Sequence, residues 1–263
     1  MSKQKTTAKI ISQTRISDSI YDMRLETALA EGALPGQFIG VYTRDKSMLL
    51  PRPISICEAD RDRNMLRIVY RVVGEGTAEF SSYREGESVE ILGILGNGFP
   101  VSEGKGRTAF LVSGGIGVPP MVQLSKELEP VAGRLYNVTG YRNSDTFLKD
   151  DLAKYGEVHI ATEDGSVGTK GNVIDAMRAL NDGGIEADVI FACGPMPMLK
   201  AVKRYAEEKH IKAYISLEER MACGVGACLG CVVRTNGTDT HSYVNNARIC
   251  TDGPVFDAEY VNI

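Results

Sequence analysis

Four cysteines near the carboxyl end are the residues of this sequence best suited to specific chemistry. Cys223, Cys228 and Cys231 follow the pattern C-x4-C-x2-C, and Cys250 comes after eighteen further residues. This is the spacing of plant-type [2Fe–2S] centres, in which four thiolates hold the irons. A structural zinc site is the alternative, because four thiolates also suit tetrahedral Zn²⁺. Zinc sites usually pair two CxxC motifs, whereas Cys250 stands alone, so the spacing favours the iron–sulfur cluster.

The residues between these cysteines suit a centre that carries negative charge. Gly224, Gly226 and Gly230 allow the backbone to turn tightly and direct N–H groups at the thiolates. The other residues of the loop are small and apolar, which limits water but leaves room for a redox partner to approach. The segment from residue 213 is too short and glycine-rich to build a core alone, so we expect the metal to contribute to its stability.

Length and composition limit the classes of protein that these cysteines can serve. The chain has 263 residues, of which 43% are hydrophobic and 24% charged, as in soluble proteins with a proper core. A net charge of −4 without basic runs argues against nucleic acid as a partner. No apolar stretch has the length of a signal peptide or a membrane span, and the cysteines are clustered rather than spread. We therefore expect a soluble, cytoplasmic protein.

Residues 1–102 predict a small antiparallel β-barrel. Short runs rich in Ile, Val, Tyr and Thr are separated by Gly, Pro, Asp and Asn, the punctuation typical of strands and turns. The expected strands cover 7–17, 19–28, 36–44, 53–59 and 65–73.

Residues 103–212 predict an α/β domain with a parallel sheet covered on both faces, because strand-like and helix-like runs alternate. Expected strands lie in 107–114, 133–142, 157–164 and 187–195, and expected helices follow the first strand and cover 171–180 and 196–210. Residues 102–107 form a plausible hinge, and residues 213–263 form the small C-terminal segment that carries the cysteine cluster. The chain thus reads as three parts.

Two glycine loops follow predicted strands of the sheet. Gly114 and Gly115 precede a helix, where free N–H groups and the positive end of the helix dipole suit a pyrophosphate. The pattern there is G-x-G-x-x-P, which departs from the usual dinucleotide fingerprint, so an ordinary strand-to-helix turn explains it equally well. Cys193 and Gly194 end a second strand, and ligands of parallel sheets bind at such carboxyl ends. Cys193 itself is equally well explained as a small buried residue.

The barrel offers a candidate site for a flavin nucleotide. Arg52 beside Pro53 can clamp a diphosphate with its planar guanidinium, and the Ser55 hydroxyl can bond a flavin ring edge. Thr77 follows a glycine-rich turn that leads into a short helix. Structural roles also explain these residues without a flavin. Arg52 would form a surface salt bridge, and Tyr70, in the predicted strand 65–73, would pack in the barrel.

Taken together, these motifs resemble the electron transfer subunits of dihydroorotate dehydrogenase B, a family of the ferredoxin reductase superfamily. The resemblance runs from about Lys9 to the end of the chain, and the cysteine segment with the preceding "SLEERM" is its most specific part. The motifs that carry it are "RPISI", "YRVVGEGT", "GNGF", "SGGIGVPPM", "ACGPMPMLKAV" and "SLEERMACGVGACLGCVV".

The resemblance implies an FAD-binding barrel, an NAD-binding sheet and a C-terminal [2Fe–2S] domain, and it assigns residues to each. The set it implies is Arg52, Pro53, Ile54, Ser55, Val69, Tyr70, Arg71, Gly76 and Thr77 for FAD; Gly114, Gly115, Cys193 and Gly194 for NAD; and Cys223, Cys228, Cys231 and Cys250 for the cluster. It implies no further catalytic residue.

The function that the resemblance implies is electron transfer in pyrimidine (UMP) biosynthesis. Electrons would pass from the FMN of a separate catalytic subunit, through the cluster and FAD, to NAD⁺, in a heterotetramer of two subunits of each kind. The alternative is an equivalent reductase subunit of a sulfide, ferredoxin or hydrogenase complex. Some of those carry an acidic residue at the first cluster position, where this chain has Cys223. A rival of another class is a zinc-stabilised module that binds a nucleotide as a signal.

No residues remain that would build a site for an orotate-sized acid. The histidines, His159, His210 and His241, are isolated in the sequence and are better explained by packing or exposure than by catalysis. We therefore expect the chain alone to oxidise NADH with artificial acceptors but not to form orotate. The preference for NAD over NADP rests on the resemblance. The residues alone do not give it, because Arg142 follows a predicted strand and is able to meet the 2′-phosphate of NADP.

Overall fold

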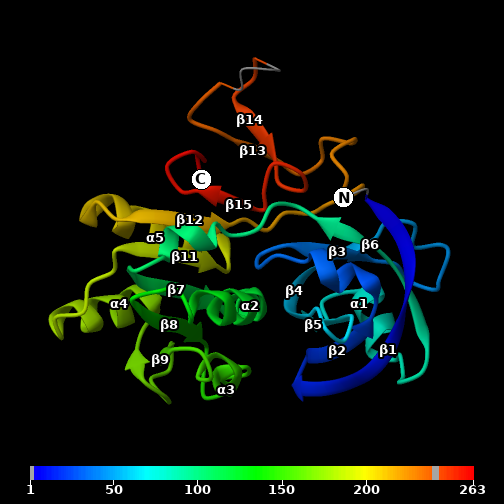
Figure 1. The fold of residues 1–263 in the computed structure, drawn as a ribbon, viewed down its shortest axis with the longest axis horizontal. Coiled ribbons are helices and arrows are strands. Elements are labelled where there is room, and N and C mark those ends of the chain that lie inside the picture. The colour runs from blue at the N-terminus through cyan, green and yellow to red at the C-terminus, as the bar shows by residue number, and fades with distance from the viewer. Residues whose placement is uncertain (1–2, 239–242) are drawn as a thin grey trace.

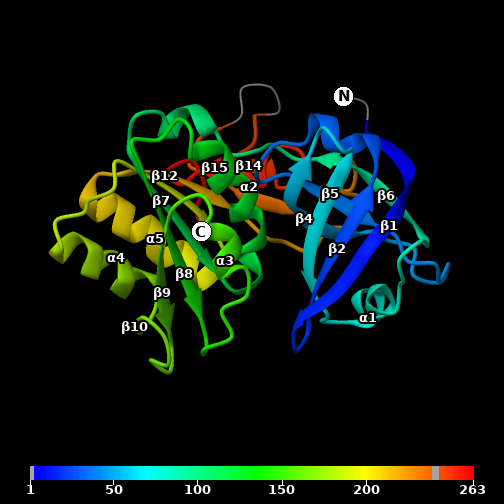
Figure 2. The ribbon, with the colours of Figure 1, turned by 60° about the horizontal axis from the view of Figure 1, so that its bottom comes forward.

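The computed structural model describes residues 3–238 and 243–263, which form a β-barrel, an α/β domain and a small lobe (Figure 1). The barrel and the α/β domain lie side by side in both views, and the lobe projects from the top of Figure 1 (Figures 1 and 2). We call the α/β part the sheet domain and residues 217–254 the cluster lobe. The predicted fold class, an antiparallel barrel followed by a parallel-sheet domain, is confirmed.

The barrel closes with the strand order β1-β2-β5-β4-β3-β6, and every pair is antiparallel. Its interior holds apolar side chains such as Ile10, Met23 and Leu66, none of which is exposed. Five strands were predicted, and β6 is the strand that the sequence analysis missed. The elements are β1 (Gln4–Ser17), β2 (Ile20–Glu26), η1 (Ala28–Gly32), β3 (Phe38–Val41), β4 (Arg52–Asp60), β5 (Met65–Arg71), α1 (Glu75–Ser81) and β6 (Ser88–Leu95).

The sheet domain is built on a seven-stranded sheet of order β10-β9-β8-β7-β11-β12-β15. All neighbours are parallel except β15, which pairs antiparallel with β12. In the register Ser113 lies beside Cys193 and Cys193 beside Ser216, so the carboxyl ends of β7, β11 and β12 meet at one edge. The strands are β7 (Thr108–Gly114), β8 (Arg134–Tyr141), β9 (Glu157–Thr162), β10 (Thr169–Lys170), β11 (Val189–Cys193), β12 (Lys212–Ser216) and β15 (Val255–Asp257).

Helices cover both faces of this sheet, as predicted. Strand β7 shows why: Phe110 belongs to the core under α4 and α5, whereas Leu111 belongs to the core under α2 and α3. Helix α2 begins with two prolines, which suit a first turn because its N–H groups need no partner within the helix. The helical elements are η2 (Val101–Gly104), η3 (Gly115–Gly117), α2 (Pro119–Leu128), α3 (Lys149–Leu152), α4 (Val173–Asp182) and α5 (Met196–Lys209).

The C-terminal part of the chain is tied into the sheet. The predicted boundary after residue 212 falls at the start of β12, and β15 also joins the sheet. What projects is the cluster lobe, which leaves after β12, forms the hairpin of β13 (Val232–Arg234) and β14 (Asn246–Arg248), and returns at β15. The division at residues 102 and 212 stays a prediction. Within residues 3–238 and 243–263, no helix has both the length and the apolar character needed to span a bilayer.

Candidate redox site

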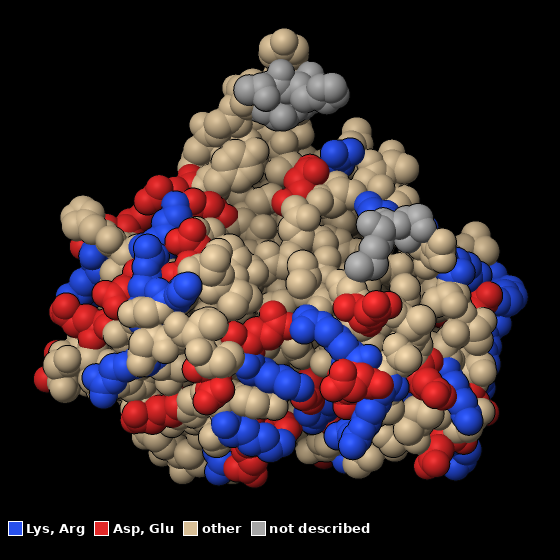
Figure 3. Space-filling view, viewed as in Figure 1, with Lys and Arg blue, Asp and Glu red and all other residues tan. Residues whose placement is uncertain are grey.

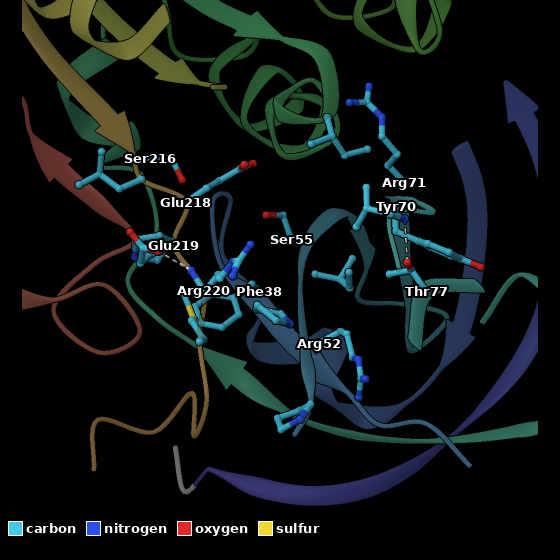
Figure 4. Close-up of a pocket in the computed structure, with 18 of the residues that line it drawn as sticks. Phe38, Arg52, Ser55, Tyr70, Arg71, Thr77, Ser216, Glu218, Glu219 and Arg220 are labelled. Atoms are coloured by element: carbon cyan, nitrogen blue, oxygen red, sulfur yellow. Dashed lines mark hydrogen bonds between the residues drawn. The ribbon is translucent and has the colours of Figure 1, made fainter. Parts of the chain in front are cut away.

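A cavity of about 830 Å³ lies where the barrel, the sheet domain and the cluster lobe meet (Figure 4). Its volume falls in the range of ligand and cofactor pockets. Strands β4 and β5 line one side, Ile116 of the first glycine loop lines another, and the segment 216–221 closes the third. Of the residues predicted for FAD, those that line it are Arg52, Pro53, Ile54, Ser55, Val69, Tyr70, Arg71 and Thr77.

Arg52 is held at the cavity wall by backbone carbonyls. Its Nη1 donates to the carbonyl of Leu50 at 2.6 Å and to that of Met48 at 3.4 Å. Gly76, the one predicted FAD residue outside the cavity lining, lies against this side chain. A Cβ at Gly76 would come within 2.1 Å of Arg52 Nε, so the glycine leaves the space that the guanidinium occupies. Gly76 therefore affects the cavity only through the position of the Arg52 side chain.

Thr77 holds the turn that precedes α1. Its Oγ1 accepts from the backbone N–H of Val73 at 2.9 Å and of Gly74 at 3.2 Å, and it donates to the Gly74 carbonyl at 3.0 Å. The hydroxyl is thus engaged within the turn. Thr77 shapes the cavity wall chiefly by fixing the backbone from Val73 onward.

Tyr70 is among the residues that line the cavity, while its ring belongs to the barrel core. The ring is 1% exposed and stacks on Tyr21 with centroids 5.8 Å apart, and the hydroxyl donates to Gln13 Oε1 at 3.0 Å. Burial raises the pKa of this phenol. In Figure 4 the ring points away from Ser55, which reaches into the cavity (Figure 4). The packing alternative thus describes the side chain of Tyr70.

The two glycine loops of the sheet domain touch each other at the carboxyl edge of the sheet. A Cβ at Gly117 would lie 2.3 Å from the Cys193 carbonyl, and one at Gly194 would lie 2.5 Å from Met198 Cε. Gly114 is equally confined, because its Cβ would meet Met198 Sδ at 2.8 Å. The glycines are required by this close packing as well as by any nucleotide, and the nucleotide site stays a prediction.

Gly115 and Cys193 differ in what they can offer to a nucleotide. Gly115 has a φ of +54°, and a Cβ there would lie 3.7 Å from Arg71 Nη2, so this loop faces the cavity in which FAD is predicted to bind. The Cys193 thiol is 1% exposed, lies beside Ser216, and has a pKa raised by burial. Arg142 is exposed directly after the end of β8. The preference for NAD over NADP stays a prediction.

The sequence analysis did not assign the segment 216–221 to a site, although this segment forms the third wall of the cavity. Glu218 and Arg220 extend from it towards the cavity in Figure 4 (Figure 4). Glu218 is open to solvent through the cavity but surrounded by protein elsewhere; burial raises the pKa of its carboxyl, and the positive charge of Arg71 opposes that effect. The available signals were the position of this segment before Cys223 and its motif "SLEERM", which belongs to the most specific part of the family resemblance.

The four cysteines of the cluster lobe form two pairs. The thiol of Cys223 lies near that of Cys228, and the thiol of Cys231 lies near that of Cys250. Among the described residues, no three His, Cys, Asp or Glu side chains converge on one point as a mononuclear site requires. Two pairs suit a [2Fe–2S] cluster, in which each iron takes two protein ligands, better than one tetrahedral zinc.

Backbone N–H groups surround these thiols, as the sequence predicted. The N–H of Val225 donates to Cys223 Sγ, that of Gly230 to Cys228 Sγ, and that of Cys250 to Cys231 Sγ, each at 3.4 Å. Such donors stabilise the thiolates of a cluster and tune its potential. The donor set therefore fits the group that the spacing predicts.

The glycines of the loop contribute unequally to this turn. Gly224 and Gly226 have φ values of +68° and +87°, so the predicted tight turning of the backbone is confirmed there. Gly230 is absent from the positive-φ positions of the described chain, and its neighbour Leu229 has φ +57° instead. Gly230 nevertheless directs its N–H at Cys228 Sγ, as predicted. A Cβ at Gly230 would meet only Cys228 Sγ, at an ordinary 3.5 Å.

The outer and inner cysteine pairs lie in different surroundings. Burial disfavours ionisation of Cys223, but N–H groups from Val225 and Cys228 outweigh it and lower the pKa of this thiol to about 6. Burial and the neighbouring Cys231 raise the pKa of Cys250 to about 11. Cys228 is exposed, whereas Cys231 and Cys250 are buried. The outer pair is therefore the one that a partner can approach.

The histidines do not enter the site. His159 lies on β9 and His210 ends α5, and neither lines the cavity. His241 lies outside the described residues.

Comparison with solved structures defines the class of protein. An NADH-dependent reduced ferredoxin–NADP oxidoreductase superposes with a TM-score of 0.86 at 26% identity, over 97% of this chain and 89% of its own. A ferredoxin–NADP⁺ reductase from Neisseria gonorrhoeae with bound FAD and NADP superposes with a TM-score of 0.67 over 78% of this chain and 91% of its own. At 14% identity the second likeness shows the fold alone. The fold and the site are those of a ferredoxin reductase-type protein with a C-terminal iron–sulfur domain.

Sequence comparison then gives the family. The profile described as the iron–sulfur cluster binding domain of dihydroorotate dehydrogenase B matches residues 218–262. The dihydroorotate dehydrogenase B (NAD⁺) electron transfer subunit of Listeria monocytogenes is 43% identical over 261 residues, covering 98% of this chain and 99% of that protein. The chain belongs to the family of dihydroorotate dehydrogenase B electron transfer subunits.

Proposed function

We propose that this chain is the electron transfer subunit of an NAD-dependent dihydroorotate dehydrogenase and connects its catalytic subunit with NAD⁺ in pyrimidine (UMP) biosynthesis. Its family supports this role. The observation that carries it is the continuity of one segment: residues 216–221 line the cavity, and Cys223 follows Met221 by two positions. A short stretch of backbone thus joins a cavity of cofactor size to a cluster thiolate.

Two cofactors explain why one chain contains both sites. When bound, FAD exchanges electrons in pairs or singly and a [2Fe–2S] cluster exchanges them singly, which connects hydride chemistry at NAD with single-electron transfer. The chain supplies binding and orientation. Arg52 presents a fixed guanidinium for the diphosphate, and Ser55 directs a hydroxyl into the cavity (Figure 4). The paired cysteines, surrounded by N–H donors, hold the irons.

The nicotinamide nucleotide would bind where the glycine loops meet the flavin cavity. Gly114, Gly115 and Gly194 bring the backbone close to this edge without side chains, so N–H groups can approach a pyrophosphate. Ile116 lines the flavin cavity from the same loop. A nucleotide bound along the loops would therefore have its reactive end directed at the flavin.

The cluster lobe offers a surface for the catalytic subunit. Figure 3 shows few charged side chains over the upper part of the molecule, whereas charges of both signs crowd the lower part (Figure 3). Exposed apolar side chains on the lobe are Val225, Leu229, Val232, Tyr243 and Val244. Such a patch next to Cys228 suits a protein interface. The partner would be an FMN-containing subunit, two of each subunit would form a cytoplasmic heterotetramer, and this surface would lie between them.

Separate purification of the chain and its complex tests the proposal. The isolated chain, loaded with FAD and iron, should reduce a dye with NADH but form no orotate from dihydroorotate. Adding the catalytic subunit should give NAD⁺-dependent orotate formation. Orotate from the isolated chain, or co-purification with a sulfide or ferredoxin enzyme in place of the FMN subunit, would contradict the proposal.

A further inference from the structure

Arg67 on β5 lies at the contact between the barrel and the sheet domain and is not part of the cavity lining. Its Nε and Nη2 donate to Asp22 Oδ2 on β2 at 2.9 and 2.7 Å, and Nη2 also donates to Asp151 Oδ2 on α3 at 3.0 Å. Only 10% of the Arg67 side chain is exposed. Because Asp22 belongs to the barrel and Asp151 to the sheet domain, one guanidinium joins the two.

A second bridge lies beside this one. Lys126 on α2 donates to Glu58 on β4 at 2.8 Å, and Glu58 lies 3.7 Å from Arg67 Nη1. Lys154 donates to the other oxygen of Asp151 at 2.6 Å. Acids and bases balance in this group, which we call the interface network: Asp22, Glu58, Arg67, Lys126, Asp151 and Lys154.

The interface network is carried by the same elements as the redox site. Strand β4 contributes Arg52–Ser55 to the cavity and Glu58 to the network, and β5 contributes Val69–Arg71 and Arg67. Helix α2 starts immediately after the first glycine loop and carries Lys126. A shift of α2 against β4 would therefore move the glycine loop relative to the flavin cavity.

The rest of the contact between the barrel and the sheet domain is closely packed around these bridges. The side chain of Gln123 on α2 accepts from the backbone N–H of Ala59 at 2.9 Å, and both groups are buried. The predicted hinge at 102–107 is also packed, because a Cβ at Gly104 would lie 2.4 Å from Leu128 Cδ2. Polar contacts of defined geometry thus act together with the apolar core shared by the two domains in setting their orientation.

We propose that Arg67 and Asp151 are positioning residues, which fix the nucleotide loops at the distance from the flavin cavity that hydride transfer requires. This inference rests on the proposed function. Hydride transfer depends steeply on geometry, and a displacement of about 1 Å can cost about 100-fold in rate. Both residues lie outside the cavity lining, so their loss should change the rate constant of transfer more than the affinity for either nucleotide.

Two conservative variants of the FAD-loaded protein test this. Asp151→Asn keeps the shape and leaves Arg67 paired with Asp22, so no buried charge loses its partner. Arg67→Lys keeps the charge but loses the planar fork that reaches both aspartates. Lys46→Gln is the control, because the ion pair of Lys46 with Glu90 is exposed and joins two parts of the barrel rather than the barrel and the sheet domain. The reduction of flavin by NADH is followed by stopped-flow absorbance, and the Kd of NAD⁺ by titration.

We expect Asp151→Asn to slow flavin reduction about tenfold while the Kd of NAD⁺ changes less than about twofold. Arg67→Lys should act in the same direction, and Lys46→Gln should match the wild type. Amide hydrogen exchange should be faster in α2 and α3 of both network variants, a readout that does not depend on turnover.

The outcomes separate the two proposals. If NADH does not reduce the wild-type flavin, the proposed function fails and this inference fails with it. If the wild type is reduced and both network variants are reduced at the same rate, the positioning role alone is overturned. A loss of rate that only follows a loss of bound FAD would also overturn it, because it would show a structural effect.

Discussion

At the scale of single residues, the site depends on groups that place other groups. Gly76 leaves space for Arg52, and the Thr77 hydroxyl fixes the turn at Val73. The cysteines likewise depend on N–H donors at Val225 and Gly230. A binding residue recognised by its type therefore acts only in a backbone that less conspicuous residues fix.

Gly76→Ala tests this dependence in the flavin cavity. The added Cβ would meet Arg52 Nε at 2.1 Å and displace the guanidinium from the cavity wall. We expect FAD to bind about tenfold more weakly, the equivalent of about 1.4 kcal/mol, as measured by titration of the deflavinated protein. Gly74→Ala is the matched control, because a Cβ there meets nothing within 4 Å. Equal affinities of the two variants would refute the role of Gly76.

Cys228→Ser tests the assignment of the cluster ligands. Removing one thiolate from the exposed pair should abolish the visible absorbance of the cluster and most of the bound iron, because a hydroxyl is a poor substitute for a thiolate at iron. Cys57→Ala on β4 is the control and should retain both. Zinc in the wild-type protein, in place of iron, would show that the assignment is wrong.

Most of the residues predicted for FAD line the cavity, but sequence reasoning did not give their parts in it. Arg52 and Ser55 were predicted from side-chain chemistry, and they line the cavity as such. Tyr70 was predicted as well, yet its ring packs on Tyr21 in the barrel core, which depends on pairing between distant strands. Glu218 belongs to the "SLEERM" motif, but it had no assigned part before the fold placed it near the charge of Arg71.

At the scale of elements, the cluster loop is a series of turns in which only some glycines are irreplaceable. Gly226 combines φ +87° with contact to Thr251, whereas Gly230 has an ordinary φ and open surroundings. The sequence alone could not separate them, because the spacing of glycines does not reveal which of them has a positive φ angle. The sequence also missed strands that are defined by pairing rather than by their own composition, such as β6, which pairs with β1 and β3, and β15, which pairs with β12.

Gly226→Ala and Gly230→Ala form a matched pair. A Cβ at Gly226 would lie 2.8 Å from Thr251 Cγ2 in a left-handed backbone, which costs about 1–2 kcal/mol for a non-glycine residue. We expect the Gly226 variant to lose its cluster several-fold faster in a chelator, followed by bleaching, and the Gly230 variant to resemble the wild type. Comparable loss in both would contradict the distinction.

At the scale of the whole molecule, apolar and charged contacts both join the barrel to the sheet domain. The cores on the two faces of the sheet also include barrel residues such as Leu95 and Val69, and the interface network adds charged contacts to this apolar packing. Although burial acts in the opposite direction, Arg67 and Lys154 lower the pKa of Asp151. The ionised carboxylate is therefore favoured by folding.

Acid should remove this contribution. Because the pKa of Asp151 is lower in the folded chain, its stabilisation is complete above the ordinary Asp pKa of about 4 and is lost as the pH falls through the folded value. Asp151→Asn should thus be less stable than the wild type in urea at pH 7, with the difference shrinking below about pH 4. A difference in unfolding midpoint that is independent of pH would exclude the ionised carboxylate as its source.

The pairing of β12 with β15 has a consequence for how such a chain can be modified. Ser216 lies opposite Val255, so the excursion that carries the cysteines leaves and re-enters the sheet at neighbouring positions. It is an insertion between adjacent strands and can be exchanged as a cassette. A tight turn in its place would leave the barrel and sheet joined but remove Glu218–Met221 from the flavin cavity. Removal of the cluster lobe would thus yield a flavoprotein whose cavity is open to solvent on the side towards the cluster, where single electrons leave.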